Sequence, residues 1–465
     1  MAETLKWIIW MVLVWSRYFV KGLGELFDAV ITKDRRTSIP IIQEKPRVLL
    51  HACIGEGYFR KAGVPEDRYF GNLASELRAL GYDVIVLPWL VNVQRSTRDA
   101  FRWFRKHSDQ YIIPEDFYSI ADYAWAAGVV IKHARLFKGD QVFEGVTIRH
   151  LIKEACRKSA ADPEIAKFVR YFRLIKKLAK RDFHIDIFID KFENMITEKP
   201  QVLALRKFMP DVMTVGFQHA LAPHPLLLNM FTTPEETKVA PHPDAIVCNS
   251  SFTAELFSKE GFSPEQLRVG PSMRYRYLLS QKKNKKDRGN VVLIVLPLDA
   301  VFLREVMAKA WQAFSHDKNI LFQIKVHPMI SREDWNRVLR DTPLSSNWDE
   351  CTVEISEMVS VVKCALVAGG STASLELLLA GVPVVMIGAE TDIVMNPLAW
   401  FPELEGPVYS PDDLKRKILN VLSNYEEEAS KVEAWARAKR HQCLSDINQK
   451  NIAAFVSPVD KVIKI

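Results

Sequence analysis

Short apolar runs alternate with amphipathic segments along most of this chain. The runs at 47–51, 83–87, 185–189, 212–216 and 245–248 have the length and the β-branched content of buried strands. Between the first two, apolar residues at helical spacing predict a helix over 73–80, which Gly81 ends. This alternation predicts βαβ units on a parallel sheet.

A second series of the same kind begins after residue 290. It predicts strands at 291–296, 320–326, 364–368 and 383–387, and helices at 301–314, 332–340, 371–380, 412–422 and 426–444. The segment 281–290 between the two series has no apolar residue, so we interpret it as a domain linker. The fold class that follows is α/β, with two doubly wound, Rossmann-like domains that face each other across a cleft.

The predicted domains are an N-terminal one at 46–280 and a C-terminal one at 290–445, followed by a tail at 446–465. Residues 95–181 read as mostly helical and form an insertion in the first domain. This insertion contains 19 Lys and Arg against 10 Asp and Glu, an excess larger than the +7 of the whole chain. Within it, 165–181 is a basic amphipathic helix, and two interpretations stay open: packing on the core, or contact with anionic lipid or an anionic acceptor.

The N-terminal segment 1–30 contains an apolar run from Trp7 to Trp15, bounded by Lys6 and Arg17. The run is shorter than the roughly 20 residues of a comfortable membrane span, and no small-residue cleavage site follows it. Tryptophans flanked by cations suit the lipid headgroup region. We therefore predict peripheral, monotopic membrane contact through residues 5–21 on the cytoplasmic face. A helix docked on the protein itself and a short tilted span are the alternatives.

The most informative motif is Gly369-Gly370-Ser371-Thr372, between the strand at 364–368 and the helix that follows. Backbone N–H groups and the positive end of the helix dipole point out of such a turn, and the glycines let a phosphate approach closely. Ser371 and Thr372 can donate to phosphate oxygens, while Glu376 can accept hydrogen bonds from ribose hydroxyls. A Ser/Thr cap with glycines chosen only for the turn is the alternative, but the whole strand-turn-helix-strand pattern favours phosphate binding.

Lys325-Val326-His327-Pro328 ends the predicted strand at 320–326. We expect this loop at the same sheet edge as the Gly370-Ser371 turn, on a neighbouring strand. There Lys325 and His327 can hold a phosphate oxygen, and Pro328 stiffens the loop. A lone His-Pro pair is usually structural, but two such loops at one edge indicate a site.

In the first domain, Glu193 and His219 each follow a predicted strand, so both are expected at the cleft. One of them is a candidate general base, or Glu193 orients His219 or the acceptor. The structural alternatives are that His219 bonds a carbonyl group and that Glu193 caps a helix. Arg274, near the domain junction, is a candidate donor contact.

Metal and disulfide signals are poor. Asp186 and Asp190 are not an Asp-x-Asp pair, no helix carries a convincing His-x-x-x-His, and the six cysteines are scattered as buried thiols in a reducing compartment would be. We therefore predict no metal site. A leaving nucleotide would be stabilised by the helix dipole, the hydroxyls, Lys325 and His327.

Taken in order, segments 190–194, 216–219, 270–275, 325–328 and 370–374 resemble bacterial surface-carbohydrate glycosyltransferases of the capsule, O-antigen or teichoic-acid type. These enzymes have the GT-B fold, and in sialyl-, Kdo- and CDP-glycerol-type relatives a His-Pro and a Ser-Ser or Ser-Thr motif bind the nucleotide phosphate. The resemblance implies that role for the following residues: Lys325, His327, Pro328, Gly370, Ser371 and Thr372. Because Gly-Gly-Ser-Thr followed by Glu376 is also similar to UDP-sugar transferases, CMP-, CDP- and UDP-linked donors stay open.

The implied function is metal-independent transfer of a sugar from a nucleotide-sugar donor to a lipid-linked or polysaccharide acceptor. It would take place at the cytoplasmic face of the inner membrane, with no cofactor other than the donor substrate and no nucleic-acid partner. Two alternatives remain. One is a nucleotide-sugar 2-epimerase of the same fold, and the other is a non-catalytic scaffold of a polysaccharide assembly complex.

Overall fold

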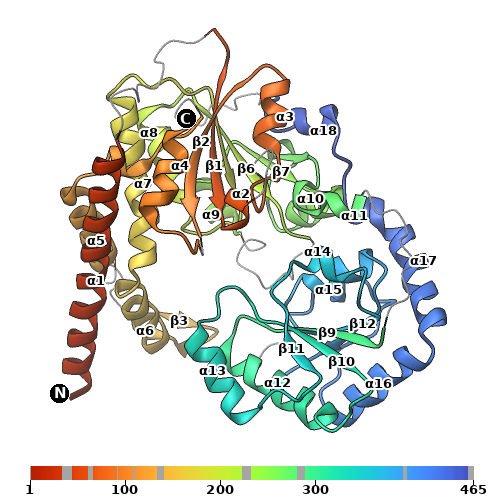
Figure 1. The fold of residues 1–465 in the computed structure, drawn as a ribbon. Helices are drawn as coiled ribbons and strands as arrows, with labels where there is room; N and C mark the ends of the chain where they lie inside the picture. Colours follow the sequence, from red (N-terminus) through yellow and green to blue (C-terminus); the bar gives the residue numbers. More distant parts are fainter. Residues whose placement is uncertain are drawn as a thin grey trace.

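Two parallel sheets organise the protein, one above the other in Figure 1. The computed structural model describes residues 2–33, 44–60, 66–91, 93–107, 110–133, 141–221, 232–279, 289–390 and 395–458. The strand order is β2-β1-β5-β6-β7-β8 in the first sheet and β11-β10-β9-β12-β13 in the second. All strand pairs within these two sheets are parallel. The predicted α/β fold class with two Rossmann-like sheets is confirmed.

The first sheet consists of β1 (Arg47–Ile54), β2 (Asp83–Leu90), β5 (Ile187–Lys191), β6 (Met213–Gln218), β7 (Ala245–Cys248) and β8 (Leu267–Val269). The second consists of β9 (Val291–Val295), β10 (Leu321–Lys325), β11 (Trp348–Glu350), β12 (Cys364–Ala368) and β13 (Val384–Ile387). Their central strands are rich in buried apolar residues because helices cover both faces, although β5 ends in Asp190 and Lys191, which are also buried. The three-residue edge strands β8 and β11 carry charged residues and give no apolar run, so the pattern did not predict them.

Helices of the first half surround its sheet (Figure 1). They are α1 (Ala2–Thr32), α2 (Gly57–Arg60), α3 (Leu73–Ala79), α4 (Thr97–Arg105), η1 (Pro114–Asp116), α5 (Ile120–His133), α6 (Arg149–Ala160), α7 (Pro163–Ala179), α8 (Lys199–Phe208), α9 (Pro234–Val239), α10 (Ser251–Lys259), η2 (Pro264–Gln266), η3 (Met273–Tyr275) and α11 (Arg276–Leu279). A small antiparallel hairpin, β3 (Val142–Phe143) with β4 (Val146–Thr147), lies between α5 and α6 in sequence.

The second half contains α12 (Ala300–Phe314), α13 (Arg332–Asp341), α14 (Ile355–Met358), α15 (Ala373–Leu379), η4 (Pro397–Trp400), α16 (Pro411–Ser423), α17 (Tyr425–Cys443) and α18 (Gln449–Ala453). Helices α12 and α16 pack on one face of the second sheet through a core that includes Phe302, Leu303, Leu414 and Ile418. Helix α15 contributes Leu375 and Leu377 to a core on the other face.

Helix α7, the predicted basic helix, packs inside the protein. Its apolar residues Leu174, Ile175 and Leu178 are fully buried. Its cations are also held by the protein: the Arg173 guanidinium stacks 4.4 Å from the Trp125 ring centroid, and Lys177 donates to the Phe117 carbonyl at 2.7 Å. The structure therefore agrees with the core-packed interpretation of 165–181, while Lys180 and Arg181 at the end of the segment are exposed.

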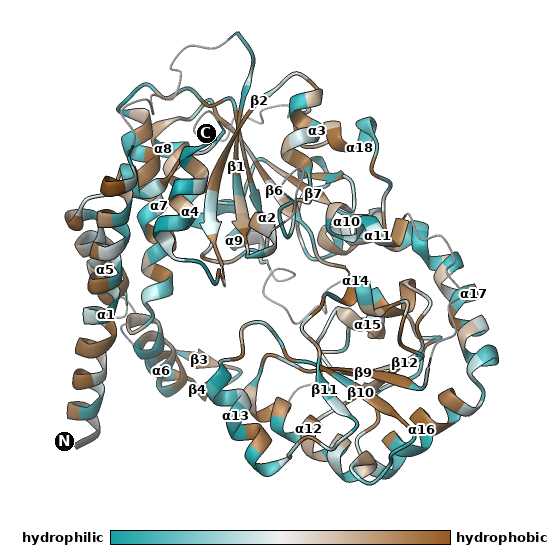
Figure 2. Cartoon of the chain, viewed as in Figure 1, coloured by the Kyte–Doolittle hydropathy of each residue, from teal (hydrophilic) through white to brown (hydrophobic). Residues whose placement is uncertain are grey.

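Helix α1 docks on the protein along one side and exposes apolar residues along the other. Trp15 and Tyr18 are buried at 7% and 6% exposure, and the Trp15 indole donates to the Ala160 carbonyl at 3.1 Å. Large apolar side chains are exposed from Leu5 to Ile31, and Figure 2 shows a largely hydrophobic N-terminal part of the helix. Within the described ranges, no helix combines the length and the hydrophobicity needed to cross a bilayer.

The C-terminal end of the chain returns to the first sheet. After α17, the Ser445 N–H donates to the Asn249 carbonyl at 3.1 Å and to the Ser272 hydroxyl at 2.9 Å. Ile452 and Phe455 then enter the core beneath the first sheet. The described part of the predicted tail, up to residue 458, thus completes the N-terminal half. Most of the predicted linker, residues 280–288, lies outside the described residues.

Candidate functional site

Three predicted residues of the N-terminal half, Glu193, His219 and Arg274, meet at the carboxyl edge of the first sheet. Glu193 follows β5, His219 follows β6, and Arg274 lies in η3. The His219 ring stacks on Tyr69 with centroids 4.0 Å apart. Its Nδ1 lies 3.3 Å from an Arg274 Nη1, and its Nε2 lies 3.5 Å from Glu193 Oε1. The contacts of these side chains thus differ from the two structural alternatives, which were a carbonyl bond for His219 and a helix cap for Glu193.

The contacts of His219 fix its protonation. Burial is the main cause that lowers the pKa of His219 to about 4, and the nearby charges of Arg274 and Lys191 act in the same direction against Glu193. The ring is therefore neutral at pH 7. Because a guanidinium can only donate hydrogen bonds, Nδ1 must accept from Arg274, which places the imidazole proton on Nε2, facing Glu193. Glu193 thus holds the tautomer that leaves the Nδ1 lone pair directed toward the domain junction.

Glu193 is held in its ionised form by two neighbours. Burial works against the charge, but the hydrogen bond with His219 and the positive charge of Lys191 hold the pKa of Glu193 well below its usual range. Lys191 is 3% exposed and bonds both Glu193 and the Thr197 hydroxyl. One carboxylate oxygen of Glu193 is directed at Lys191 and the other at His219. The arrangement therefore suits Glu193 for orienting His219 better than for taking a proton itself.

On the second sheet, the Gly370-Ser371 turn has part of the predicted geometry. Gly370 has a φ of +88°, which an L-residue rarely adopts, so glycine is required there. The Ser371 Oγ accepts from the Ala373 N–H at 3.3 Å, and Thr372 makes no side-chain cap bond. Helix α15 begins at Ala373 and has seven residues, so it is shorter than the predicted 371–380. Ser371 therefore caps α15, in agreement with the structural alternative, whereas Thr372 makes no cap bond.

Glu376 links the two halves of the protein. The Tyr277 hydroxyl of α11 donates to Glu376 Oε1 at 2.7 Å. Burial raises the pKa of Glu376, while the nearby Arg274 guanidinium and the Tyr277 bond lower it. Arg274 therefore acts on His219 at the first sheet and on Glu376 at the second. This carboxylate has a second oxygen available for a ligand hydroxyl.

The loop with Lys325 and His327 follows β10, which is the strand predicted at 320–326, and lies at the carboxyl edge of the second sheet as expected. In the sheet order, β9 lies between β10 and β12, so the two motif loops are not on neighbouring strands as expected. Sequence order misled the prediction because the doubly wound topology inserts the first strand of the series between them. The two loops flank the end of β9.

The side chains of Lys325 and His327 each bond to a backbone group of the described residues. Lys325 Nζ donates to the Val353 carbonyl at 2.5 Å, and His327 Nδ1 accepts from the Met329 N–H at 3.2 Å. Burial and, to a smaller extent, the charge of Arg68 lower the pKa of His327. Pro328 is exposed. His327 is half-buried and lies near the positive charge of Arg68.

Several residues that line the space between the two sheets were not predicted from the sequence. A pocket of about 350 Å³ contains Asp67, Arg68, Arg276, Tyr277 and Ser356 beside Arg274. Asp67 is 7% exposed, and burial raises its pKa to about 7, although the Tyr69 and Phe70 N–H groups donate to its Oδ1. Its other oxygen has no hydrogen-bond partner among the described residues. No motif surrounds these residues, so only the folded chain reveals them.

Metal ligation finds no support in the part of the chain that the structure describes. No group of three or more His, Cys, Asp or Glu side chains there has the arrangement of a metal site. All six cysteines are buried and free. The positive charges at the cleft come from Arg68, Arg274, Arg276 and Lys325 instead.

Comparison with known proteins bears on the fold. No protein-family model and no curated protein matches the sequence. Among solved structures, S. aureus MnaA with UDP matches with a TM-score of 0.50 at 11% identity, covering 84% of this chain and 91% of that one. A UDP-GlcNAc 2-epimerase from Neisseria meningitidis bound to UDP-GlcNAc and Anabaena HepE in complex with UDP-glucose both match with a TM-score of 0.48 at 13% identity. They cover 83% and 89% of this chain, and 94% and 100% of their own.

Identities this low speak for the fold and not for the reaction. The likeness to MnaA agrees with the two parallel sheets. The chain is therefore an α/β protein of the GT-B architecture.

Proposed function

We propose that the protein is a metal-independent glycosyltransferase that moves a sugar from a nucleotide-sugar donor to a lipid-linked or polysaccharide acceptor. The observation that carries this proposal is the chain of contacts from Glu193 through His219 and Arg274 to Glu376. It joins the carboxyl edges of both sheets, which is where ligands of such sheets bind. A donor held at the second sheet would therefore meet a proton acceptor held at the first.

In the proposed reaction, an acceptor hydroxyl attacks the anomeric carbon of the donor sugar. The new bond forms between the acceptor oxygen and that carbon, while the bond from the carbon to the phosphate oxygen breaks and the nucleotide leaves with the electron pair. The hydroxyl proton passes to His219 Nδ1. Arg274 covers this atom in the structure, and a donor phosphate would draw the guanidinium away, because a bidentate phosphate pair is stronger than its bond to a neutral ring.

The second sheet supplies the donor contacts. Thr372, His327 and Glu376 would contact the donor from this edge, with Thr372 and Glu376 exchanging their contacts with Tyr275 and Tyr277. Arg68 and Arg274 would neutralise the leaving phosphates together with Lys325, in place of a divalent cation. UDP, CDP and CMP are all compatible with this set of contacts.

The exposed face of α1 supports action at a membrane surface. Its outward residues include Leu13, Val20 and Leu23, each more than half exposed, with the exposed cations Lys6 and Arg17 close by in sequence. An apolar stripe with adjacent cations suits an anionic bilayer surface. Leu13→Glu should reduce flotation with vesicles containing anionic lipid, whereas Leu203→Glu, at an exposed position on α8, should not. Equal flotation of both variants and the parent protein would argue against membrane contact through α1.

The central experiment titrates UDP, CDP, CMP and GDP into the protein by calorimetry and then incubates the tightest donor class with and without acceptors. Binding of one nucleotide and transfer to an acceptor are the expected results. Formation of an epimer from the donor alone would identify the protein as a 2-epimerase. If none of the four nucleotides binds, the non-catalytic scaffold is the better interpretation.

A further inference from the structure

A pocket of about 360 Å³ lies in the N-terminal half, beside the carboxyl end of β2. Helices α1, α4 and α7 form its walls together with the end of β2 and the η1 segment. Most of these walls belong to the N-terminal helix and to the insertion at 95–181, which are additions to the alternating α/β series. Its size lies within the range of small-molecule sites. The N-terminal helix and the insertion thus form a second pocket, separate from the proposed donor site.

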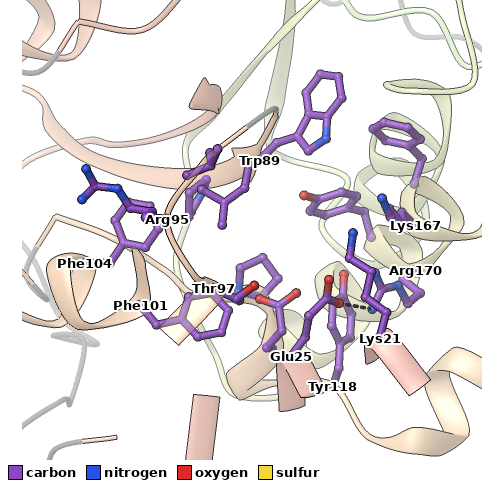
Figure 3. A pocket seen from close by; sticks show the side chains of 17 residues that line it. Lys21, Glu25, Trp89, Arg95, Thr97, Phe101, Phe104, Tyr118, Lys167 and Arg170 are labelled. Carbon is purple, nitrogen blue, oxygen red and sulfur yellow. Dashed lines mark ion pairs between the residues drawn. The ribbon is translucent and has the colours of Figure 1, made fainter. Parts of the chain in front are cut away.

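A buried guanidinium faces this pocket without a full set of partners. Arg170 is 4% exposed, and its Nε and Nη1 atoms have no hydrogen-bond partner among the described residues. Its nearest acid is Glu25, with Nη1 3.9 Å from Oε2, and its guanidinium stacks 3.9 Å from the Tyr123 ring centroid. Buried donors left unpaired are costly, so a ligand oxygen at this position would relieve the cost. Figure 3 shows Arg170, Lys21 and Glu25 gathered at one side of the pocket, opposite Trp89.

The remaining lining combines aromatic faces with groups that both donate and accept hydrogen bonds. Trp89 and Phe168 lie edge to face at 5.1 Å, and Tyr171 lines the pocket beside them. Such rings cover the apolar faces of sugars, while Glu25 and the Thr97 hydroxyl can accept and donate to hydroxyl groups.

The charge of the lining is positive. Four cations, Lys21, Arg95, Lys167 and Arg170, line the pocket with two acids, Glu25 and Glu115. Arg95 pairs with Glu56 and Lys167 pairs with Glu164, so a ligand would meet the charges of Lys21 and Arg170. Burial raises the pKa of Glu115 well above its usual range, helped by the charge of Glu25, so the acids carry less than two negative charges near neutral pH. Lys21 is exposed at the rim and makes no ion pair among the described residues. An anionic group on the ligand is therefore favoured.

We propose that this pocket holds a phosphorylated sugar, with the sugar on the aromatic wall and the phosphate between Lys21 and Arg170. The inference rests on the proposed function, in which the bound sugar phosphate is the acceptor. The pocket adjoins the reacting groups, because Lys191, which holds Glu193, lies 5.7 Å from the Trp89 ring centroid. The phosphate ester comes either from a soluble sugar phosphate or from a lipid-linked one whose chain follows the apolar face of α1.

The test uses the full-length protein and titrates glucose 1-phosphate, glucose and inorganic phosphate by calorimetry or ligand-observed NMR. A fourth probe is a sugar phosphate carried on a short polyprenyl chain in neutral phosphatidylcholine vesicles. Glucose 1-phosphate or the lipid-carried probe should bind more tightly than glucose or phosphate alone. Whichever of the two sugar phosphates binds more tightly, the soluble or the lipid-carried one, is assigned as the source of the phosphate ester. Equal binding of glucose and either sugar phosphate would overturn the proposal.

Lys21→Gln is the first variant, because it removes one charge at an exposed position of α1, and Lys6→Gln is its matched control on the same helix. Loss of one charge-assisted contact should weaken binding of the phosphorylated probe by about tenfold in Lys21→Gln and leave Lys6→Gln unchanged. Equal weakening in both variants would show a general charge effect and overturn the assignment.

Tyr118→Phe gives a second, milder variant, since its buried hydroxyl has no hydrogen-bond partner among the described residues and its removal conserves the ring. It should weaken sugar-phosphate binding by about threefold, and an unchanged affinity would remove that hydroxyl from the site. UDP affinity, measured in parallel on every variant, separates the two proposals. If UDP binds and no sugar phosphate does, the pocket assignment fails and the proposed function stands. If the sugar phosphate binds with the expected dependence on Lys21 and no nucleotide binds, the proposed function fails instead.

Discussion

The carboxyl edges of the two sheets differ in how their polar side chains are held. At the first sheet, Lys191, Glu193, His219 and Arg274 are bonded to one another, and both Lys191 and His219 are 3% exposed. At the second sheet, Lys325 and His327 are partly exposed and bonded to the backbone of their own or an adjacent loop. The polar side chains at the first edge contact one another, whereas those at the second edge make backbone contacts that a ligand can replace.

This difference fits a division of labour between the sheets. A network of buried charges keeps a tautomer and an orientation fixed, as proton transfer requires. Side chains that are held by single hydrogen bonds to the backbone can exchange those bonds for bonds to a nucleotide at a small cost in free energy. Substitutions at the first edge should therefore act on turnover and stability, and substitutions at the second on affinity for the nucleotide.

The largest effect is expected for Glu193→Gln. The amide keeps the shape of the side chain but loses the charge that holds Lys191 and the His219 tautomer, so turnover should fall about 100- to 1000-fold. UDP affinity should stay within about twofold, because the residue lies at the other sheet. Steady-state kinetics with calorimetry measures both, and Glu255→Gln, at an exposed position on α10, is the control. A variant with normal turnover would remove Glu193 from the reaction.

The pH dependence of stability tests whether the first edge is as buried as its contacts indicate. Because the pKa of His219 is about 4 in the folded protein and about 6.5 in the unfolded chain, the unfolded chain binds more protons between these values. The free energy of unfolding should therefore rise from pH 4 to pH 6.5, and this residue contributes about 3 kcal/mol at most.

Urea unfolding of His219→Gln should show a flatter profile over this pH range than the parent protein. His327→Asn, which changes the partly exposed histidine of the second edge, should alter the profile much less. Equal profiles for the parent and His219→Gln would contradict a neutral, buried His219.

A smaller effect is expected for the double variant Ser371→Ala with Thr372→Ala. The loss of two hydroxyl donors should weaken nucleotide binding about tenfold, while the melting temperature changes little because the structural loss is confined to the Ser371 cap bond and the Thr372 bond with the Tyr275 hydroxyl. Calorimetry with the tightest nucleotide measures the change. Unchanged affinity would mean that the turn serves α15 and not a phosphate.

The smallest effect is expected for His327→Asn. This change keeps a side chain able to accept from the Met329 N–H but moves the group that Nε2 presents to the cleft. Nucleotide affinity should fall about threefold, in line with one neutral hydrogen bond. If the loss exceeded that of the Ser371 and Thr372 double variant, the His-Pro loop would be the main phosphate site.

The sequence predicted the architecture well because buried parallel strands are marked by continuous apolar runs. The bounds of β7 and β12 agree with the predicted 245–248 and 364–368. Edge strands such as β8 escaped because a strand paired on one side only does not need an apolar run. The strand predicted at 185–189 lies at 187–191, since Asp190 and Lys191 pair with Gly216 and Phe217 of β6.

The candidate site was predicted in part. Residues that directly follow apolar runs, such as Glu193 and His219, were placed correctly at the sheet edge, because the end of a strand is visible in the pattern. Their roles as ligands or catalysts stay predictions. Asp67, Arg68 and Tyr277 could not be found, since they reach the cleft from segments without a motif, and the packing of the two halves decides what they meet.

The return of the chain to the first sheet affects how the protein can be divided. The backbone passes between the halves twice, once between residues 279 and 289 and once beyond α17. A cut at the first crossing would yield an amino-terminal fragment without Ile452 and Phe455, and thus with an incomplete interior. Fragments meant to fold alone should instead join residues 445–458 to the amino-terminal half through a designed connection. An affinity tag placed after residue 458 would be attached to the amino-terminal half, although it follows the carboxyl-terminal half in the sequence.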